Sequence, residues 1–81
     1  MAITHYKIGT NLKWSSGSTT SYAGNNMVEA DARALALAAK ETYDDIVGAD
    51  WDHITGYRVI VYSVADDGTE TALQTYTGGN Y

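Results

Sequence analysis

The sequence has no cysteine, no proline and no phenylalanine, and it carries only five lysine and arginine residues against ten acids. Because cysteine is absent, no disulfide and no thiolate metal site can cross-link the fold, and a reducing cytoplasm is favoured over a secreted location. No basic segment followed by an apolar run opens the chain, so we expect no secretory signal. The apolar runs are too short to cross a bilayer. These absences predict a soluble, cytoplasmic protein.

The excess of acids gives the chain of 81 residues a formal net charge of −5. Phosphate binding depends on clustered lysine and arginine, which the sequence does not show, so we expect no direct contact with nucleic acid. A basic protein surface is the better electrostatic match. A chain of this length holds one hydrophobic core, and we expect a single domain over residues 1–81.

The first part of the chain predicts a hairpin. Polar and apolar residues alternate along residues 5–14, and the apolar face holds Tyr6, Ile8, Leu12 and Trp14. We expect a bulge near Gly9 and Thr10. After a serine-rich turn, residues 19–23 return as a short, polar strand at a sheet edge.

The last part of the chain predicts a second hairpin. Residues 57–65 are rich in β-branched and aromatic side chains on both faces, which is typical of a central strand. Residues 66–68 form a turn of the Asp-Gly type, and residues 70–77 return as the fourth strand. Residues 78–81 are expected to be a loose, flexible tail.

Between the hairpins, residues 27–47 form a predicted helix, because they are rich in alanine, leucine, glutamate and lysine. Asn26 and Glu29 resemble a capping box, and Gly48 is the expected stop. Leu37 falls on the polar face, either as a lone exposed leucine or as an interface contact. The core-facing stripe is predicted to comprise Val28, Ala32, Leu35, Ala39, Tyr43 and Ile46, widened by Ala36 and Val47.

The predicted order is β-β-α-β-β, an α+β fold with one helix packed on a four-stranded, mainly antiparallel sheet. This layout resembles the β-grasp arrangement of bacterial immunoglobulin-binding domains, and residues 11–19 are similar to their first hairpin. The resemblance covers element order and turn chemistry, and a fold does not carry a function with it.

No set of residues predicts an enzyme, a cofactor site or a metal site. His5 and His53, the two histidines, lie far apart in the sequence, and converging histidines and carboxylates are what metal or acid–base chemistry needs. The serine- and threonine-rich residues 15–21 lack a nucleophile or phosphate-binding motif. One group of aspartates does not have EF-hand spacing: Asp44, Asp45, Asp50 and Asp52.

The grouped acids are the candidate partner-binding residues. The first group comprises Glu41, Asp44, Asp45, Asp50 and Asp52, and the second comprises Asp66, Asp67 and Glu70. A solvated surface that keeps the protein soluble would explain them equally well. Trp51 and Tyr57 lie in or beside the first group, and an aromatic ring framed by carboxylates suits an arginine-rich partner. Trp51 is equally well explained as a core residue under the loop.

In profile, a compact, acidic, cysteine-free chain without an enzyme signature resembles the small inhibitors that phages encode against bacterial defences, such as anti-CRISPR and anti-restriction proteins. The resemblance implies blockade of a basic surface on a larger protein or nucleoprotein complex in the host cytoplasm. One alternative is a β-grasp-like binding module that adds a strand at residues 19–23. Another is a small homodimeric enzyme or ligand-binding protein.

Overall fold

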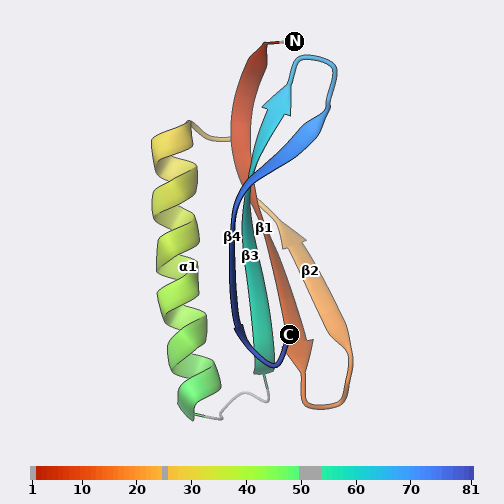
Figure 1. Cartoon of the computed structure of the whole chain (residues 1–81), viewed down its shortest axis with the longest axis vertical. Coiled ribbons are helices and arrows are strands. Elements are labelled where there is room, and N and C mark those ends of the chain that lie inside the picture. The colour runs from red at the N-terminus through yellow and green to blue at the C-terminus, as the bar shows by residue number, and fades with distance from the viewer. Residues whose placement is uncertain (1, 25, 50–53) are drawn as a thin grey trace.

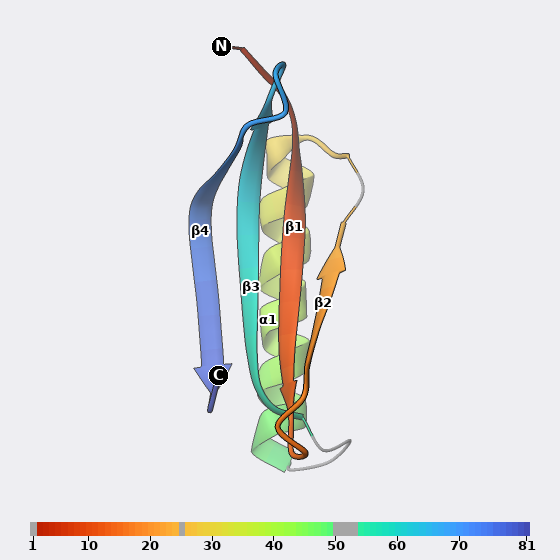
Figure 2. The same ribbon diagram turned by 90° about the vertical axis from the view of Figure 1, so that its right-hand side faces the viewer.

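The computed structural model describes residues 2–24, 26–49 and 54–81. Its elements are β1 (Ile3–Trp14), β2 (Thr19–Ala23), α1 (Glu29–Ala49), β3 (Ile54–Ala65) and β4 (Glu70–Gly79). The helix runs along one face of a four-stranded sheet (Figure 1). Figure 2 looks at the face of the sheet that the helix leaves uncovered. The predicted α+β fold and its element order are confirmed.

The sheet is antiparallel throughout, with the strand order β2-β1-β3-β4. The two hairpins therefore meet through β1 and β3. A β-grasp sheet joins its hairpins through a parallel pair, so the likeness to that arrangement ends at element order. As predicted, β3 is central and β2 lies at an edge. The helix packs on β1, β3 and β4, and it makes no contact with β2 within the described residues.

The core lies between α1 and the inner face of the two central strands. Alternation places Ile8 and Leu12 of β1 on this face, where they are 7% and 4% exposed. On β3, the same face presents the largest fully buried side chains, Tyr57, Val59 and Val61. The half-buried Tyr6 and Trp14 pack against this cluster. The predicted apolar face of the first strand is thus confirmed.

The helix begins at Glu29, two residues later than predicted. Met27 is held in an isolated bridge, because its backbone exchanges hydrogen bonds of 2.8 and 2.9 Å with Tyr6. The predicted capping box is therefore wrong: Asn26 precedes this bridge, and the Glu29 carboxylate binds Arg33 at 3.0 Å. At the other end α1 continues one residue past Gly48.

The face that the helix turns to the sheet differs in part from the predicted stripe. Ala32 and Ala36 are completely buried, whereas Val28 and Leu35 are 63% and 47% exposed. Alanine has no side chain beyond Cβ, so these positions let the helix backbone approach the sheet closely. Further along α1, the partly buried residues of the stripe do contact the core as predicted: Ala39, Tyr43, Ile46 and Val47.

Two smaller expectations are wrong. The predicted bulge near Gly9 is absent, since β1 pairs with β3 without interruption from His5 to Lys13. The predicted loose tail is part of the sheet up to Gly79, which pairs with Gly56. The predicted turn at residues 66–68 is confirmed by a 2.9 Å hydrogen bond from the Gly68 N–H to the Ala65 carbonyl.

Candidate functional site

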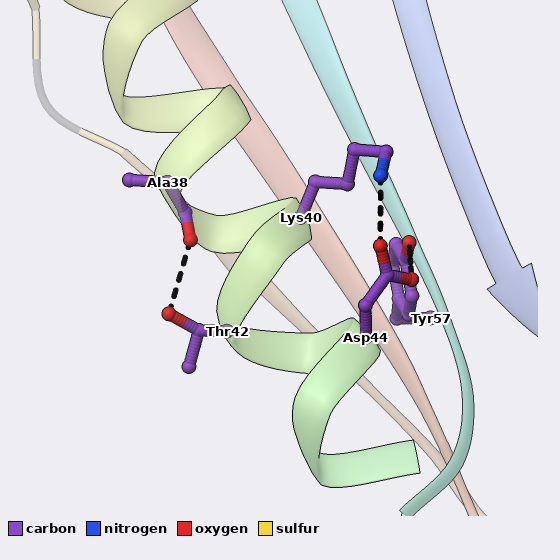
Figure 3. A network of polar contacts seen from close by, with 5 residues as sticks. All are labelled: Ala38, Lys40, Thr42, Asp44 and Tyr57. Atoms are coloured by element: carbon purple, nitrogen blue, oxygen red, sulfur yellow. Dashed lines mark hydrogen bonds and ion pairs between the residues drawn. The ribbon is translucent and has the colours of Figure 1, made fainter. Parts of the chain in front are cut away.

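Asp44, a member of the first predicted acidic group, belongs to a polar network that ties α1 to β3 (Figure 3). The Lys40 ammonium lies 2.7 Å from its Oδ2, and the Tyr57 hydroxyl donates to its Oδ1. The hydrogen bond from Lys40, and then that from Tyr57, lowers the pKa of Asp44. Asp44 therefore has a structural role at the helix–sheet contact.

Tyr57 is not a surface residue, so its predicted role as a partner contact is wrong. Its side chain is only 1% exposed, and its ring packs against that of Tyr43 with centroids 5.9 Å apart. Burial, together with the hydrogen bond to the Asp44 carboxylate, raises the pKa of Tyr57 to about 12. The ring lies in the core while the hydroxyl reaches the Asp44 carboxylate at its border.

The outward face of α1 carries three acids, Asp31, Glu41 and Asp45, and all three are exposed. Two leucines flank them, Leu35 and Leu37, which are 47% and 45% exposed. We call these five residues the acidic helix face. None of its three carboxylates forms an ion pair with a described residue.

Both cations of α1 are turned away from this face. Arg33 binds Glu29 and also donates to the Gln74 side chain of β4, with both distances 3.0 Å. Lys40 is bound to Asp44. The described part of the last helical turn carries no basic residue. Negative charge near a helix C-terminus is unfavourable, so Asp45 does not stabilise its own helix.

The second predicted acidic group lies at the opposite end of the molecule from the described members of the first, Glu41, Asp44 and Asp45 (Figure 1). Asp67 accepts a 3.0 Å hydrogen bond from the Thr69 backbone N–H, which lowers the pKa of Asp67. Glu70 is paired with Lys7 of β1. Asp66 is exposed at the turn. Two of the three acids in the second group are thus already engaged within the fold.

Two members of the first group, Asp50 and Asp52, lie outside the described residues, as do Trp51 and His53. His5 lies on β1 with its Nδ1 3.0 Å from the Thr4 hydroxyl. Within residues 2–24, 26–49 and 54–81, no three histidine, aspartate or glutamate side chains gather in a way that could hold a metal ion.

Sequence reasoning missed the uncovered face of the sheet. Lys7 and Lys13 project from β1 on the side opposite Ile8 and Leu12, and Arg58 joins them because it pairs with Asn11 in the β1–β3 register. Three of the five lysine and arginine residues thus share one face. The alternation of residues 5–14 already indicated that the two lysines share a face. That Arg58 lies on the same face follows only from the pairing register of β1 and β3.

No protein-family model, curated protein or solved structure matches the chain significantly. In the described part of the chain, no helix combines the length and the apolar character needed to cross a membrane. What the protein does must therefore be argued from its own surfaces.

Proposed function

We propose that this protein is a binding protein that docks its acidic helix face on a basic surface of a larger protein and inhibits that protein by occupying the surface. The observation that carries the proposal is the segregation of charge on α1: Asp31, Glu41 and Asp45 point outward and form no ion pair with a described residue, while Arg33 and Lys40 are bound elsewhere. A face of this sign complements clustered lysine and arginine.

The exposed leucines give this face an apolar component. Leu35 and Leu37 flank the acids and are nearly half exposed. Interfaces combine an apolar centre with a polar rim, so leucines bordered by carboxylates fit a partner that presents arginine or lysine around an apolar patch. The overall profile supports a phage-encoded inhibitor of a bacterial defence complex, of the anti-CRISPR or anti-restriction kind.

The test is a kinetic comparison of two double variants that lose the same charge. After capture of a partner from a bacterial lysate, binding is measured for Glu41→Gln/Asp45→Asn and for Asp66→Asn/Glu70→Gln across a salt series. Exposed ion pairs contribute about 0.2–1 kcal/mol each, so the helix variant should bind roughly 2- to 30-fold more weakly. The loss should appear mainly in the association rate at low salt.

The second double variant carries the same charge change at the distant turn, and it should bind like the wild type. Equal weakening by the two variants would mean that net charge, and not the acidic helix face, governs binding. Asp44 is left intact in both variants, because its loss would also disturb the contact with Tyr57.

Strand addition at β2 is a second candidate function. This strand forms one edge of the sheet, β1 is its one partner strand among the described residues, and no described part of α1 covers it. Its free edge offers backbone groups to an incoming strand. Binding by this route should be insensitive to the Glu41→Gln/Asp45→Asn change and only weakly dependent on salt.

A further inference from the structure

The uncovered face of the sheet combines three cations with two tyrosine rings. We call Lys7, Lys13, Arg58, Tyr62 and Tyr81 the basic sheet face (uncovered side in Figure 2). Lys7 is paired with Glu70, but Lys13 and Arg58 form no ion pair with a described residue. This face is positive although the whole chain carries a formal charge of −5.

Arg58 is the centre of this face and has unused donors. Its guanidinium stacks on the Tyr81 ring, 4.6 Å from the centroid, and Nη2 donates to the Tyr81 hydroxyl over a long 3.4 Å. Its Nε is buried without a hydrogen-bond partner in the described residues. A partly buried guanidinium without a carboxylate is costly unless an anion completes it, and its fork of donors suits a phosphate or a carboxylate.

Both tyrosines of this face lie close to the backbone of the sheet. Tyr62 lies against Gly9 of the neighbouring strand, where an added Cβ would come within 3.0 Å of its Cε2. The absence of a side chain at Gly9 lets the ring rest on the backbone. The chain crosses directly over Gly56, where a Cβ would lie 2.5 Å from the Tyr81 nitrogen, so it is the backbone of Tyr81 that lies on the sheet. Tyr81 remains 40% exposed.

The groups of this face are spread along β1 and β3, with Lys7 beside Tyr62 and Arg58 beside Tyr81. Tyr62 and Arg58 are four residues apart on β3, which corresponds to about 13 Å along a strand. Cations between aromatic rings on an open sheet are the features with which proteins hold single-stranded nucleic acid: the cations neutralise phosphates, and the bases stack on the rings. An acidic peptide would use the cations but not the rings. We therefore propose that the basic sheet face binds single-stranded nucleic acid.

This inference revises the expectation from composition that the protein makes no direct contact with nucleic acid. That expectation counted charge over the whole chain, whereas the fold separates the two signs. The acidic helix face is on the outer side of α1, so the helix and the sheet lie between it and the basic sheet face. These two layers are stacked along an axis on which the Cα atoms extend 22 Å (Figure 1). Since charges more than about 10 Å apart are largely screened at 0.1 M salt, the local cations should dominate on this face.

The test uses a fluorescein-labelled 12-nucleotide strand of deoxythymidine and measures fluorescence anisotropy during titration with the intact chain. We expect a Kd of roughly 1–100 µM, typical of binding without sequence specificity. With two phosphate contacts, from the unpaired Lys13 and Arg58, the logarithm of the affinity should fall against that of the salt concentration with a slope of about −1.4, or roughly 7-fold between 50 and 200 mM. Absence of binding at protein concentrations well above roughly 100 µM at the lower salt would overturn the proposal.

Matched variants locate the site. Lys13→Gln should weaken binding and reduce the salt slope by about 0.7, whereas Arg33→Gln removes the same charge on the helix side and should have little effect. Tyr62→Leu should weaken binding about fivefold or more with an unchanged salt slope, because it removes a stacking surface and no charge. Thermal melts confirm that each variant is folded.

Two results would contradict the assignment. Equal weakening by Lys13→Gln and Arg33→Gln would show that only net charge matters. The second result has two parts: a 12-residue polyglutamate peptide competes as effectively as the unlabelled strand, and Tyr62→Leu has no effect on binding. Together they would assign the basic sheet face to an acidic protein segment instead. The measurement does not involve the acidic helix face, so its outcome is independent of the proposed inhibition.

Discussion

Substitution of Ala36 by aspartate should unfold the protein. Ala36 is completely buried between α1 and the sheet, so the new carboxylate would have neither water nor a partner. An unpaired buried charge costs several kcal/mol even after relaxation. A chain of 81 residues has a total stability of about 4–12 kcal/mol at roughly 0.05–0.15 kcal/mol per residue. The cost is comparable with the whole stability.

The matched control is Leu35→Asp, one position earlier in the helix. Leu35 is 47% exposed, so only about half of the 1.5–3 kcal/mol contributed by a fully buried leucine is lost. The lower helix propensity of aspartate adds a few tenths of a kcal/mol. A total of about 1–2 kcal/mol should lower the Tm by roughly 5–15 °C while the transition stays cooperative.

Far-UV circular dichroism during thermal melting separates the two outcomes. We expect a cooperative transition for Leu35→Asp and little or no native signal for Ala36→Asp at room temperature. A folded Ala36→Asp variant beside an unfolded Leu35→Asp variant would show that α1 presents the other side of its apolar stripe to the sheet.

Three further perturbations test contacts around the core. Tyr57→Phe removes the donor to Asp44, which keeps Lys40 and water as partners, so chemical denaturation should show a loss of about 0.5–1.5 kcal/mol. The pKa of Tyr57 is raised from 10.0 to about 12, so the stability tied to its neutral hydroxyl is complete below pH 10 and is lost as the pH rises toward 12. Tyr57→Phe should lack this alkaline loss. Identical pH profiles for the variant and the wild type would contradict the pairing of Tyr57 with Asp44. Because the pKa of Asp44 is lowered from its ordinary value of 3.8, its carboxylate contributes stability that is present above pH 3.8 and is lost as the pH falls through the pKa of the folded state. The stability of Asp44→Asn should therefore be less sensitive to acid than that of the wild type in the same denaturation series. Gly78→Ala would place a Cβ against the Tyr57 ring and should lower the stability by about 1–3 kcal/mol. Its control is Gly17→Ala, where the Cβ meets no neighbour but φ is +92°, so only a backbone strain of about 1 kcal/mol is expected. Equal losses of stability in the two variants would mean that the Tyr57 ring moves aside.

Much of the fold was predictable because local patterns specify local structure. The period of two in residues 5–14, the alanine-rich helical segment and the Asp-Gly turn each depend on neighbours along the chain. These features predicted five elements in the observed order. The start of the helix was mispredicted because the bridge between Met27 and Tyr6 depends on residues far apart in the sequence.

The candidate surfaces were predictable only in part. Sequence grouping indicated Glu41 and Asp45, which are exposed on α1. It also indicated Tyr57 and Asp44, which the fold uses at the helix–sheet contact. Adjacency in sequence does not distinguish a free carboxylate from one held by a buried hydroxyl, because the hydroxyl comes from another element.

The sequence by itself determined the class of the fold, the alternation of the strands and the excess of negative charge. The tertiary structure decided which side of the helix faces the sheet, since the alanines permit a closer approach than Leu35 does. It also decided that Arg58 joins Lys7 and Lys13, because only the antiparallel register of β1 and β3 brings them to one face. Side-chain periodicity is a local property of the backbone, whereas register and the rotation of a helix depend on how separate elements pack.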